Sequence, residues 1–224
     1  MSAKMATVIG ATGLIGSHLL KLLEQDAHFD TIRVLVRRPF EKTSSKTEVK
    51  LVDFNDHESF KLAIDGSDAV FCAIGTTQKK VKGDKAAYRK VDYDIPLKAS
   101  QFCKETGCPN FLLVSSSGAN SNSKNFYLKL KGEVENAVAE KQLHSTSIFR
   151  PSILLGNRNE SRPGERIGQI AMQAFSFALI GSLRKYKPVH AREVAIAMLQ
   201  AAKKERPGFT VYEYDAMMQE VRSP

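Results

Sequence analysis

Tyr127 and Lys131 are the pair in this chain whose types and spacing best suit chemistry, because they lie four residues apart in a segment with a helical pattern. At that spacing two side chains share one face of a helix. A free tyrosine has a pKa near ~10, too high for ready proton exchange at neutral pH. A neighbouring lysine cation favours the phenolate and lowers this pKa. Tyr127 could therefore give a proton to a substrate oxygen, with Lys131 as its electrostatic partner.

Three consecutive serines, Ser115 to Ser117, end a predicted strand that begins at Phe111. When helices cover both faces of a parallel sheet, ligands bind at the carboxyl ends of the strands. One hydroxyl would hold the substrate oxygen, and we expect Ser116 to do so, with Ser115 as the next candidate. A Tyr-x-x-x-Lys match alone is common on surface helices. The serine-ending strand in front of it makes the pattern informative.

A glycine-rich turn that would hold a cofactor lies near the start of the chain, in Gly10-Ala11-Thr12-Gly13-Leu14-Ile15-Gly16. It follows the apolar run Met5–Ile9 and precedes a leucine-rich helical pattern. Gly10 would let the chain turn off the strand, Gly13 would let the backbone approach a pyrophosphate, and Gly16 would let the helix pack on the sheet. Free N–H groups at the helix start would face the phosphates. A tight turn without a ligand is the alternative interpretation.

Two arginines predict which dinucleotide this turn would bind. Proteins that bind NAD usually have an acidic residue near the end of the second strand, where it holds the ribose hydroxyls. Here Arg37 and Arg38 directly follow the predicted strand Ile32–Val36. A guanidinium can bind a 2′-phosphate through paired, charge-assisted hydrogen bonds. We therefore expect NADP(H) rather than NAD(H), the alternative being two arginines at a solvated strand end.

Two further strand ends supply candidates for the cofactor site. Asp53 and Phe54 follow the third predicted strand and suit a contact beside the adenine, although a plain turn explains them nearly as well. Ile74 and Gly75 follow the fourth strand, where the backbone must pass close to a cofactor. Gly75 suits that approach, or merely a turn.

The elements that must position these residues alternate along the chain. Apolar runs rich in Val, Ile and Leu are separated by segments of helical periodicity, which predicts a parallel sheet covered on both faces. We expect an α/β fold with a doubly wound parallel sheet, the Rossmann arrangement, in one domain over residues 1–224. Residues 151–224 are expected to form a small, mostly helical C-terminal cap on the substrate side. The predicted strands are 6–9, 32–36, 49–52, 69–73, 111–115, 147–149 and 209–214, and the predicted helices are 14–25, 58–63, 85–105, 127–141, 169–182 and 193–203.

Composition and charge limit the classes of function. The chain has 224 residues, a net charge of +9 and a pI of about 9.4, with basic residues scattered along it. We therefore expect a solvated surface and an anionic cofactor pocket rather than a specific nucleic-acid site. Three cysteines without a secretory signal predict a reducing, cytoplasmic location, and isolated histidines predict no metal site. The apolar stretch Ile167–Leu183 is too short and too polar to span a membrane.

Together these residues resemble the short-chain dehydrogenase/reductase superfamily, in its extended or atypical branch, over nearly the whole chain. The segments FCAIGTT (71–77), YLKLKGEVE (127–135), FRP (149–151) and ESRPGE (160–165) are further similar to the Tat-interacting-protein oxidoreductase group. This resemblance implies an NADPH site and a proton-donor role for Tyr127. The positions that it implies for NADPH are Thr12, Gly13, Leu14, Ile15, Arg37, Arg38, Ile74, Gly75, Tyr127, Lys131, Leu154 and Arg162. For Leu154 and Arg162 the resemblance is the sole ground.

One position departs from the superfamily pattern. Many members have an asparagine in the helix after the fourth strand that helps a proton relay, whereas the corresponding residue here is Asp92. An asparagine can donate a hydrogen bond and an ionised aspartate cannot. Either the relay differs in this chain or its catalysis is slow.

These observations favour an NADPH-dependent oxidoreductase that transfers a hydride between the nicotinamide and a small carbonyl or alcohol substrate, with Tyr127, Lys131 and Ser116 as catalytic residues. A catalytically weak, NADPH-sensing protein that regulates a protein partner is the alternative, which Asp92 supports. A nucleotide-sugar epimerase or dehydratase ranks last, because the roughly 70 residues after Arg150 are few for the substrate domain of such an enzyme. Segments 153–155 and 171–183 are expected to give the substrate pocket an apolar wall. The oligomeric state is left open.

Overall fold

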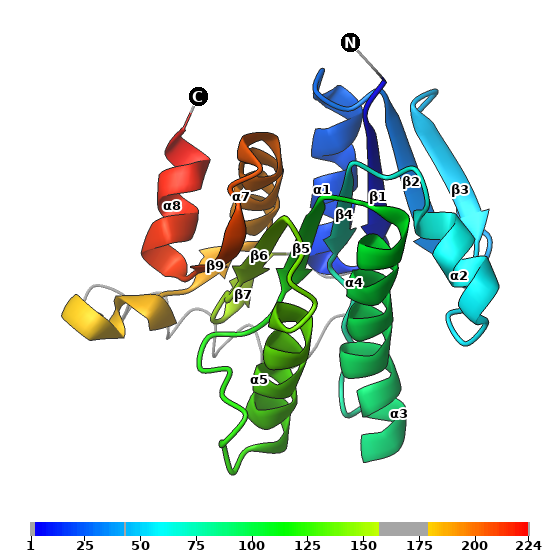
Figure 1. Ribbon diagram of the computed structural model, residues 1–224. Helices are drawn as coiled ribbons and strands as arrows, with labels where there is room; N and C mark the ends of the chain where they lie inside the picture. Colours follow the sequence, from blue (N-terminus) through cyan, green and yellow to red (C-terminus); the bar gives the residue numbers. More distant parts are fainter. Residues whose placement is uncertain (1–2, 43, 157–178, 224) are drawn as a thin grey trace.

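A computed structural model describes residues 3–42, 44–156 and 179–223 of the chain. Helices and strands alternate along it as the sequence predicts (Figure 1). The strands are β1 (Met5–Ile9), β2 (Thr31–Val36), β3 (Thr47–Leu51), β4 (Ala69–Cys72), β5 (Asn110–Val114), β6 (Ser145–Phe149), β7 (Leu154–Leu155), β8 (Val189–His190) and β9 (Gly208–Tyr212). The helices are α1 (Leu14–Gln25), α2 (His57–Ile64), α3 (Lys85–Arg89), α4 (Ile95–Thr106), α5 (Phe126–Ala139), α7 (Ala191–Lys204) and α8 (Tyr214–Arg222), together with the π-helical turn η1 (Lys90–Asp94) and the 3₁₀ segment η3 (Gly181–Tyr186).

Seven of the described strands form one parallel sheet in the order β3-β2-β1-β4-β5-β6-β9. The order of strands reverses between β1 and β4. From β1 the chain adds β2 and β3 on one side, and it then returns to add β4, β5 and β6 on the other side of β1. In open α/β sheets this reversal leaves a crevice at the carboxyl ends of the two strands, where ligands bind. The topology therefore places a site directly beside the glycine turn that follows β1.

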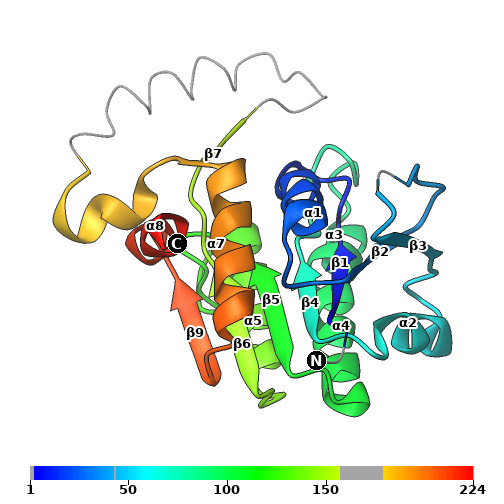
Figure 2. The ribbon, with the colours of Figure 1, turned by 90° about the horizontal axis from the view of Figure 1, so that it is seen from above.

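Helices cover both faces of the sheet, and each face has its own apolar core. Seen from above, α1, α7 and α8 lie on one side of the strands, and α2, α4 and α5 lie on the other (Figure 2). Leu19 of α1 and Met198 of α7 belong to the first core, and Phe60 of α2 and Phe102 of α4 to the second. Central strands such as β4 and β6 are buried along their whole length. Burial on both faces explains the nearly continuous apolar runs of the sequence.

The C-terminal part of the chain is helical as expected, but much of it belongs to the main layers rather than to a cap. β9 pairs in parallel with β6 and extends the sheet, and α7 packs along α1 on the same face. β7 and β8 form a short separate sheet that the sequence pattern did not predict. Most of the helix predicted over 169–182 lies outside the described residues, and its last two residues belong to η3.

The helix predicted as one piece over 85–105 is divided by η1 between α3 and α4. A π-helical turn accommodates one extra residue per turn, and such turns occur frequently at functional sites. Asp92 lies in this turn and is buried, while its neighbour Lys90 is exposed. The irregular turn thus directs a charged side chain into the interior.

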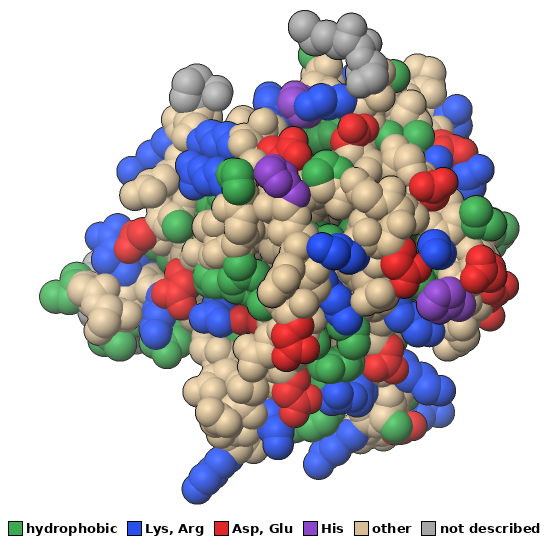
Figure 3. All heavy atoms as spheres, in the orientation of Figure 1, with side chains coloured by type: hydrophobic (Ala, Val, Ile, Leu, Met, Phe, Trp, Pro, Cys, Tyr) green, Lys and Arg blue, Asp and Glu red, His purple; other side chains and the backbone are tan. Residues whose placement is uncertain are grey.

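On the face shown in Figure 3, basic and acidic side chains are interspersed. Within the described ranges, no helix is long and apolar enough to cross a membrane. The same ranges contain no group of three or more His, Cys, Asp or Glu side chains that could hold a metal ion. All three cysteines are free thiols in buried positions.

Candidate active site

The turn after β1 requires glycine at specific points. Gly10 has φ +90°, and a Cβ atom there would lie 2.7 Å from the carbonyl oxygen of Ala73. A Cβ atom on Gly16 would lie 2.1 Å from the carbonyl oxygen of Gly10. Gly16 therefore lets α1 pack on the glycine turn itself, whereas the sequence had suggested packing on the sheet.

Gly13 forms the N-cap of α1 and has no side chain with which to cap it. Its N–H donates to the carbonyl oxygen of Gly10 at 2.9 Å, which closes the turn. No acidic residue lies in the first turn of the helix. The start of α1 therefore presents uncapped backbone N–H groups, an arrangement that suits an anion.

A cavity of about 390 Å³ opens beside this turn. Its walls come from the residues that follow β1, β4, β5 and β6, with α5 and η1 supplying further side chains. The predicted site residues that line it are Thr12, Gly13, Leu14, Ile15, Ile74, Gly75, Ser116, Tyr127, Lys131 and Leu154. The fold thus brings seven of the candidate cofactor residues and the three candidate catalytic residues to one cavity.

Tyr127 and Lys131 share one face of α5, as their spacing predicts. The helix begins after Asn125, whose side chain accepts a hydrogen bond from the N–H of Leu128 at 3.1 Å. The Nζ atom of Lys131 lies 5.9 Å from the centre of the Tyr127 ring. Tyr88 packs edge-to-face against the same ring, with 6.4 Å between ring centres. Tyr127 is therefore held in the first turn of α5, with the ammonium group of Lys131 close to its ring.

Lys131 is only 4% exposed, and its charge is balanced by Asp92. The Oδ1 atom of Asp92 lies 2.9 Å from Nζ of Lys131, and its Oδ2 atom accepts the N–H of Thr76 at 2.8 Å. Burial by itself lowers the pKa of Lys131, but the attraction of Asp92 and Tyr127 and the hydrogen bond to Asp92 outweigh it and raise the pKa above its usual value. Lys131 therefore stays protonated although it is buried.

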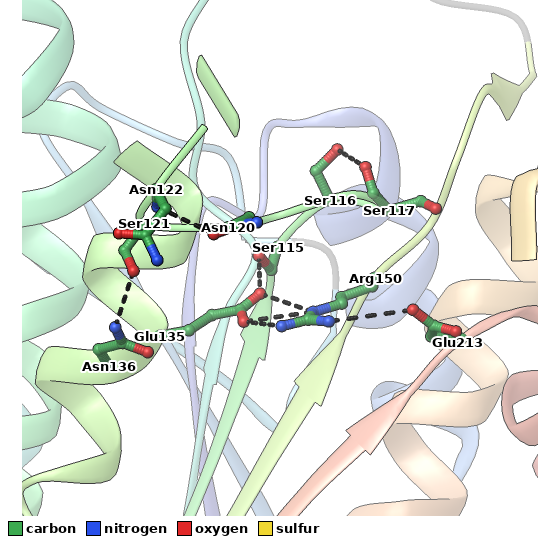
Figure 4. A network of polar contacts seen from close by, with 10 residues as sticks. All are labelled: Ser115, Ser116, Ser117, Asn120, Ser121, Asn122, Glu135, Asn136, Arg150 and Glu213. Atoms are coloured by element: carbon green, nitrogen blue, oxygen red, sulfur yellow. Dashed lines mark hydrogen bonds and ion pairs between the residues drawn. The ribbon is translucent and has the colours of Figure 1, made fainter. Parts of the chain in front are cut away.

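The three serines have different partners (Figure 4). Ser115 donates to the buried carboxylate of Glu135, and Ser117 donates to the carbonyl oxygen of Lys185 at 3.2 Å. Ser116 is partly buried, lines the cavity, and makes only a long contact of 3.3 Å to the carbonyl oxygen of Ser117. Of the three hydroxyls, that of Ser116 is the most available to a ligand, and its role at the substrate oxygen stays a prediction.

A partly buried polar network supports this serine segment (Figure 4). Both carboxylate oxygens of Glu135 accept hydrogen bonds from Nε of Arg150, at 3.0 and 3.2 Å, and the guanidinium also contacts Glu135 through a terminal nitrogen. Another nitrogen of Arg150 lies 3.9 Å from Glu213. The network joins the ends of β5, β6 and β9 to α5 and holds Ser115 in place.

The residues predicted to contact the adenosine end lie outside the cavity lining. Arg37 and Arg38 are exposed at the end of β2, and neither forms an ion pair with another described residue. Asp53 is exposed and accepts hydrogen bonds from Asn55 at 2.9 Å. The ring of Phe54 is buried against Phe60, with 4.8 Å between their centres.

Several cavity residues were not singled out from the sequence. Ser17, Thr76, Thr77, Lys80 and Ser152 all line the cavity. Thr76, Thr77 and Ser152 follow the ends of β4 and β6, so the rule that ligands bind at carboxyl strand ends would have found them. Arg162, which only the resemblance suggested, lies outside the described residues.

A second cavity of about 520 Å³ lies over the ends of β6 and β9. Arg150, Arg184, Lys185, Glu213 and Asp215 contribute to its lining. This lining is strongly charged, so the described part of this region does not supply the apolar wall that the sequence suggested. Ile153 is exposed and Leu154 lines the first cavity, whereas most of the segment 171–183 lies outside the described residues.

A seven-stranded parallel sheet with a glycine turn at its crevice defines a dinucleotide-binding protein of the Rossmann class. Residues 10–173 match the model of a family described as NAD(P)H-binding. The chain therefore belongs to this NAD(P)H-binding family of atypical short-chain dehydrogenase/reductase proteins.

Two curated relatives cover most of the chain. The rat protein HTATIP2 is 38% identical over 168 residues, which span 74% of this chain and 69% of the relative. The mitochondrial protein FMP52 of Candida glabrata is 34% identical over 211 residues, or 92% of this chain and 88% of the relative. The first agrees with the resemblance to the Tat-interacting-protein group.

Solved structures with low sequence identity share the fold. The Bordetella bronchiseptica enzyme WbmH in complex with NAD⁺ has a TM-score of 0.71 at 17% identity, covering 95% of this chain and 76% of WbmH. MoeE5 in complex with UDP-glucose and NAD has a TM-score of 0.70 at 17% identity, covering 93% of this chain and 75% of MoeE5. At this identity the likeness concerns the architecture alone.

Proposed function

We propose that this protein is an NADPH-dependent oxidoreductase that transfers a hydride between the nicotinamide and a small carbonyl or alcohol substrate. The observation that carries the proposal is a single cavity lined by the glycine turn of α1, Ser116 and the Tyr127–Lys131 pair. The family membership supports binding of the dinucleotide, and the side chains at the opposite wall support the chemistry.

The glycine turn fits the diphosphate of such a cofactor. A Cβ atom on Gly13 would already lie 3.2 Å from the carbonyl oxygen of Gly10 and would project into the turn. The bare N–H groups at the start of α1 would hold the diphosphate. Ile74 and Gly75 would line the path toward the nicotinamide, and Lys131 would hold the nicotinamide ribose.

In the direction of carbonyl reduction, each of three side chains has a defined role. When bound, a reduced nicotinamide supplies a hydride to the carbonyl carbon. Tyr127 donates its phenolic proton to the carbonyl oxygen, so that the product is the neutral alcohol. The hydroxyl of Ser116 donates a hydrogen bond to the same oxygen, and the ammonium of Lys131 stabilises the phenolate that remains.

Tyr127→Phe tests the chemical step. We expect this variant to keep its affinity for NADPH and to lose turnover by about 10²-fold or more, because the proton donor is removed while the ring remains. NADPH oxidation followed by absorbance against a panel of small carbonyl compounds gives the rate. Tyr93→Phe, on a different element, is a suitable control. Full turnover in Tyr127→Phe would show that the assigned proton donor is wrong.

NADP(H) is proposed over NAD(H) because Arg37 and Arg38 are exposed cations at the end of β2. Thermal unfolding with NADPH, NADP⁺, NADH or NAD⁺ tests this preference, since a ligand at 100 times its dissociation constant adds about 2.7 kcal/mol of stability. The double variant Arg37→Ser/Arg38→Ser should lose the NADPH shift and keep the NADH shift. Arg192→Gln, a change at an exposed arginine of α7, should behave as the wild type. A larger shift with NADH than with NADPH in the wild type would overturn the preference.

A catalytically weak, NADPH-sensing role is the second candidate. It is favoured by the buried pair between Asp92 and Lys131, because a lysine whose charge is already balanced stabilises a neighbouring phenolate less than an unpaired lysine would. Capture of a protein partner, or a change of oligomeric state, that depends on NADPH would support this role. Turnover of a carbonyl substrate without any such change would exclude it.

The cellular compartment is also a proposal. Three buried free thiols suit a reducing compartment, and we propose the cytoplasm. Some relatives have names that place them in mitochondria. Fractionation of cells that express the tagged protein distinguishes the two locations.

A further inference from the structure

Asp92 is the only acidic residue among the described residues that line the first cavity. It is 1% exposed, and both of its oxygens are used, one by Lys131 at 2.9 Å and the other by the N–H of Thr76 at 2.8 Å. An ionised carboxylate accepts at both oxygens, whereas an asparagine accepts at one and donates at the other. The isosteric amide therefore cannot make both contacts.

The backbone around Asp92 is arranged to make these contacts. The π-helical turn η1 directs the side chain inward between α3 and α4. On the opposite side, a Cβ atom on Gly75 would lie 3.5 Å from Oδ1 of Asp92, so the carboxylate lies directly against the loop after β4. The hydroxyl of Tyr88 donates to the carbonyl oxygen of Thr76 at 3.2 Å. Thr76 is therefore held at its N–H by Asp92 and at its carbonyl oxygen by Tyr88.

Among the described groups that face Lys131, Asp92 is the one that carries a negative charge to balance it. These groups are Asp92 from η1, Tyr127 from α5 and Cys72 from β4. Burial raises the pKa of the Cys72 thiol to about 12, so this thiol is neutral at physiological pH. An unpaired buried ammonium would lose its proton or move toward solvent. The position and charge of Lys131 thus depend on Asp92.

We propose that Asp92 is a positioning residue that couples the Gly75–Thr76 wall of the cofactor cavity to Lys131, so that one buried carboxylate sets the geometry of both. The inference rests on the proposed function, because it assigns Asp92 a role at the same site. In this proposal Asp92 forms a direct ion pair with Lys131, in place of the proton relay that an asparagine would support. Binding of the dinucleotide and the protonation of the Tyr127–Lys131 pair therefore depend on the same side chain.

Asp92→Asn tests the coupling by two measurements that need no substrate. Fluorescence titration with NADPH should show at least tenfold weaker binding. The second measurement is an NMR pH titration with ¹³C at tyrosine Cζ and lysine Cε, assigned with Tyr127→Phe and Lys131→Met. Without the carboxylate the Tyr127–Lys131 pair has a net positive charge, so its first proton should leave at least one pH unit lower than in the wild type.

Asp94→Asn is the matched control, because Asp94 lies in the same π-helical turn and does not line the cavity. It should bind NADPH within twofold of the wild type and leave the titration unchanged. If Asp92→Asn matches Asp94→Asn in both measurements, the proposal is overturned. If the wild type does not bind NADPH, the proposed function fails, while the titration still decides the role of Asp92.

The double variant Asp92→Asn/Lys131→Met keeps the inference testable if the single change prevents folding. It removes both charges together and leaves no unpaired ammonium in the interior. Because the two residues act as one unit, its loss of NADPH affinity should equal that of Lys131→Met within twofold. A further tenfold loss beyond Lys131→Met would show that Asp92 does not act through Lys131.

Discussion

Glu135 lies one helical turn beyond Lys131 on α5, on the same face as Tyr127. Unlike these two residues, it does not line the first cavity. It is 3% exposed and accepts hydrogen bonds from Ser115 and Arg150. Nothing in its local sequence distinguishes it from Glu133, which forms an exposed pair with Arg89 at 2.7 Å. At the scale of single residues, burial and partners decide which of two similar acids matters.

Glu135→Gln should lower the free energy of unfolding by about 3 kcal/mol, because it leaves the Arg150 guanidinium without its buried counter-charge. Glu133→Gln breaks the partly exposed pair with Arg89 and should cost at most about 1 kcal/mol. Urea unfolding at pH 7, followed by circular dichroism, gives both values. Equal losses in the two variants would show that the Glu135 network does not stabilise the fold.

At the scale of elements, the join between β1 and α1 positions the cofactor site. The first turn of α1 approaches Gly10 so closely that a single methyl group at position 16 has no room. The π-helical turn η1 has a comparable role on the other wall of the cavity, where it directs Asp92 inward. The β1–α1 turn brings backbone N–H groups to the crevice, and η1 brings the carboxylate of Asp92. A longer regular helix in either place would not direct these groups there.

Gly16→Ala should destabilise the protein by about 3 kcal/mol, because the new Cβ atom would lie 2.1 Å from the Gly10 carbonyl oxygen and would force α1 away from the turn. Gly75→Ala is the matched control, since its Cβ atom would meet Asp92 at an ordinary 3.5 Å. Thermal unfolding of both variants without cofactor compares them. A Gly16→Ala variant as stable as Gly75→Ala would contradict the tight packing described here.

At the scale of the whole molecule, two apolar cores enclose groups that titrate. Burial raises the pKa of the Cys72 thiol to about 12, whereas in an unfolded chain a thiol has a pKa near ~8.5. Above pH ~8.5 the unfolded chain loses this proton and the folded chain keeps it, so the free energy of unfolding falls as the pH rises. The raised pKa of Lys131 acts only at higher pH, because its stabilisation is complete below the unfolded value of 10.5.

The Cys72→Ala variant isolates this alkaline effect. Between pH 8.5 and ~9.5 the wild type should lose on the order of 1 kcal/mol more stability than the variant, because the variant has no thiol at this position to titrate. Urea unfolding under reducing conditions at three pH values measures the slope. Parallel slopes for the two proteins would show that Cys72 ionises equally in the folded and unfolded states.

The sequence by itself determined the order of strands and helices along the chain, the glycine turn, and the shared face of Tyr127 and Lys131. These features depend on contacts within a few residues, and local spacing records such contacts directly. Only the tertiary structure decided that Asp92 pairs with Lys131, that Glu135 holds Ser115 and Arg150, and that β9 extends the main sheet. Such contacts join segments distant in the chain, and their free energy depends on packing and burial that no local pattern specifies.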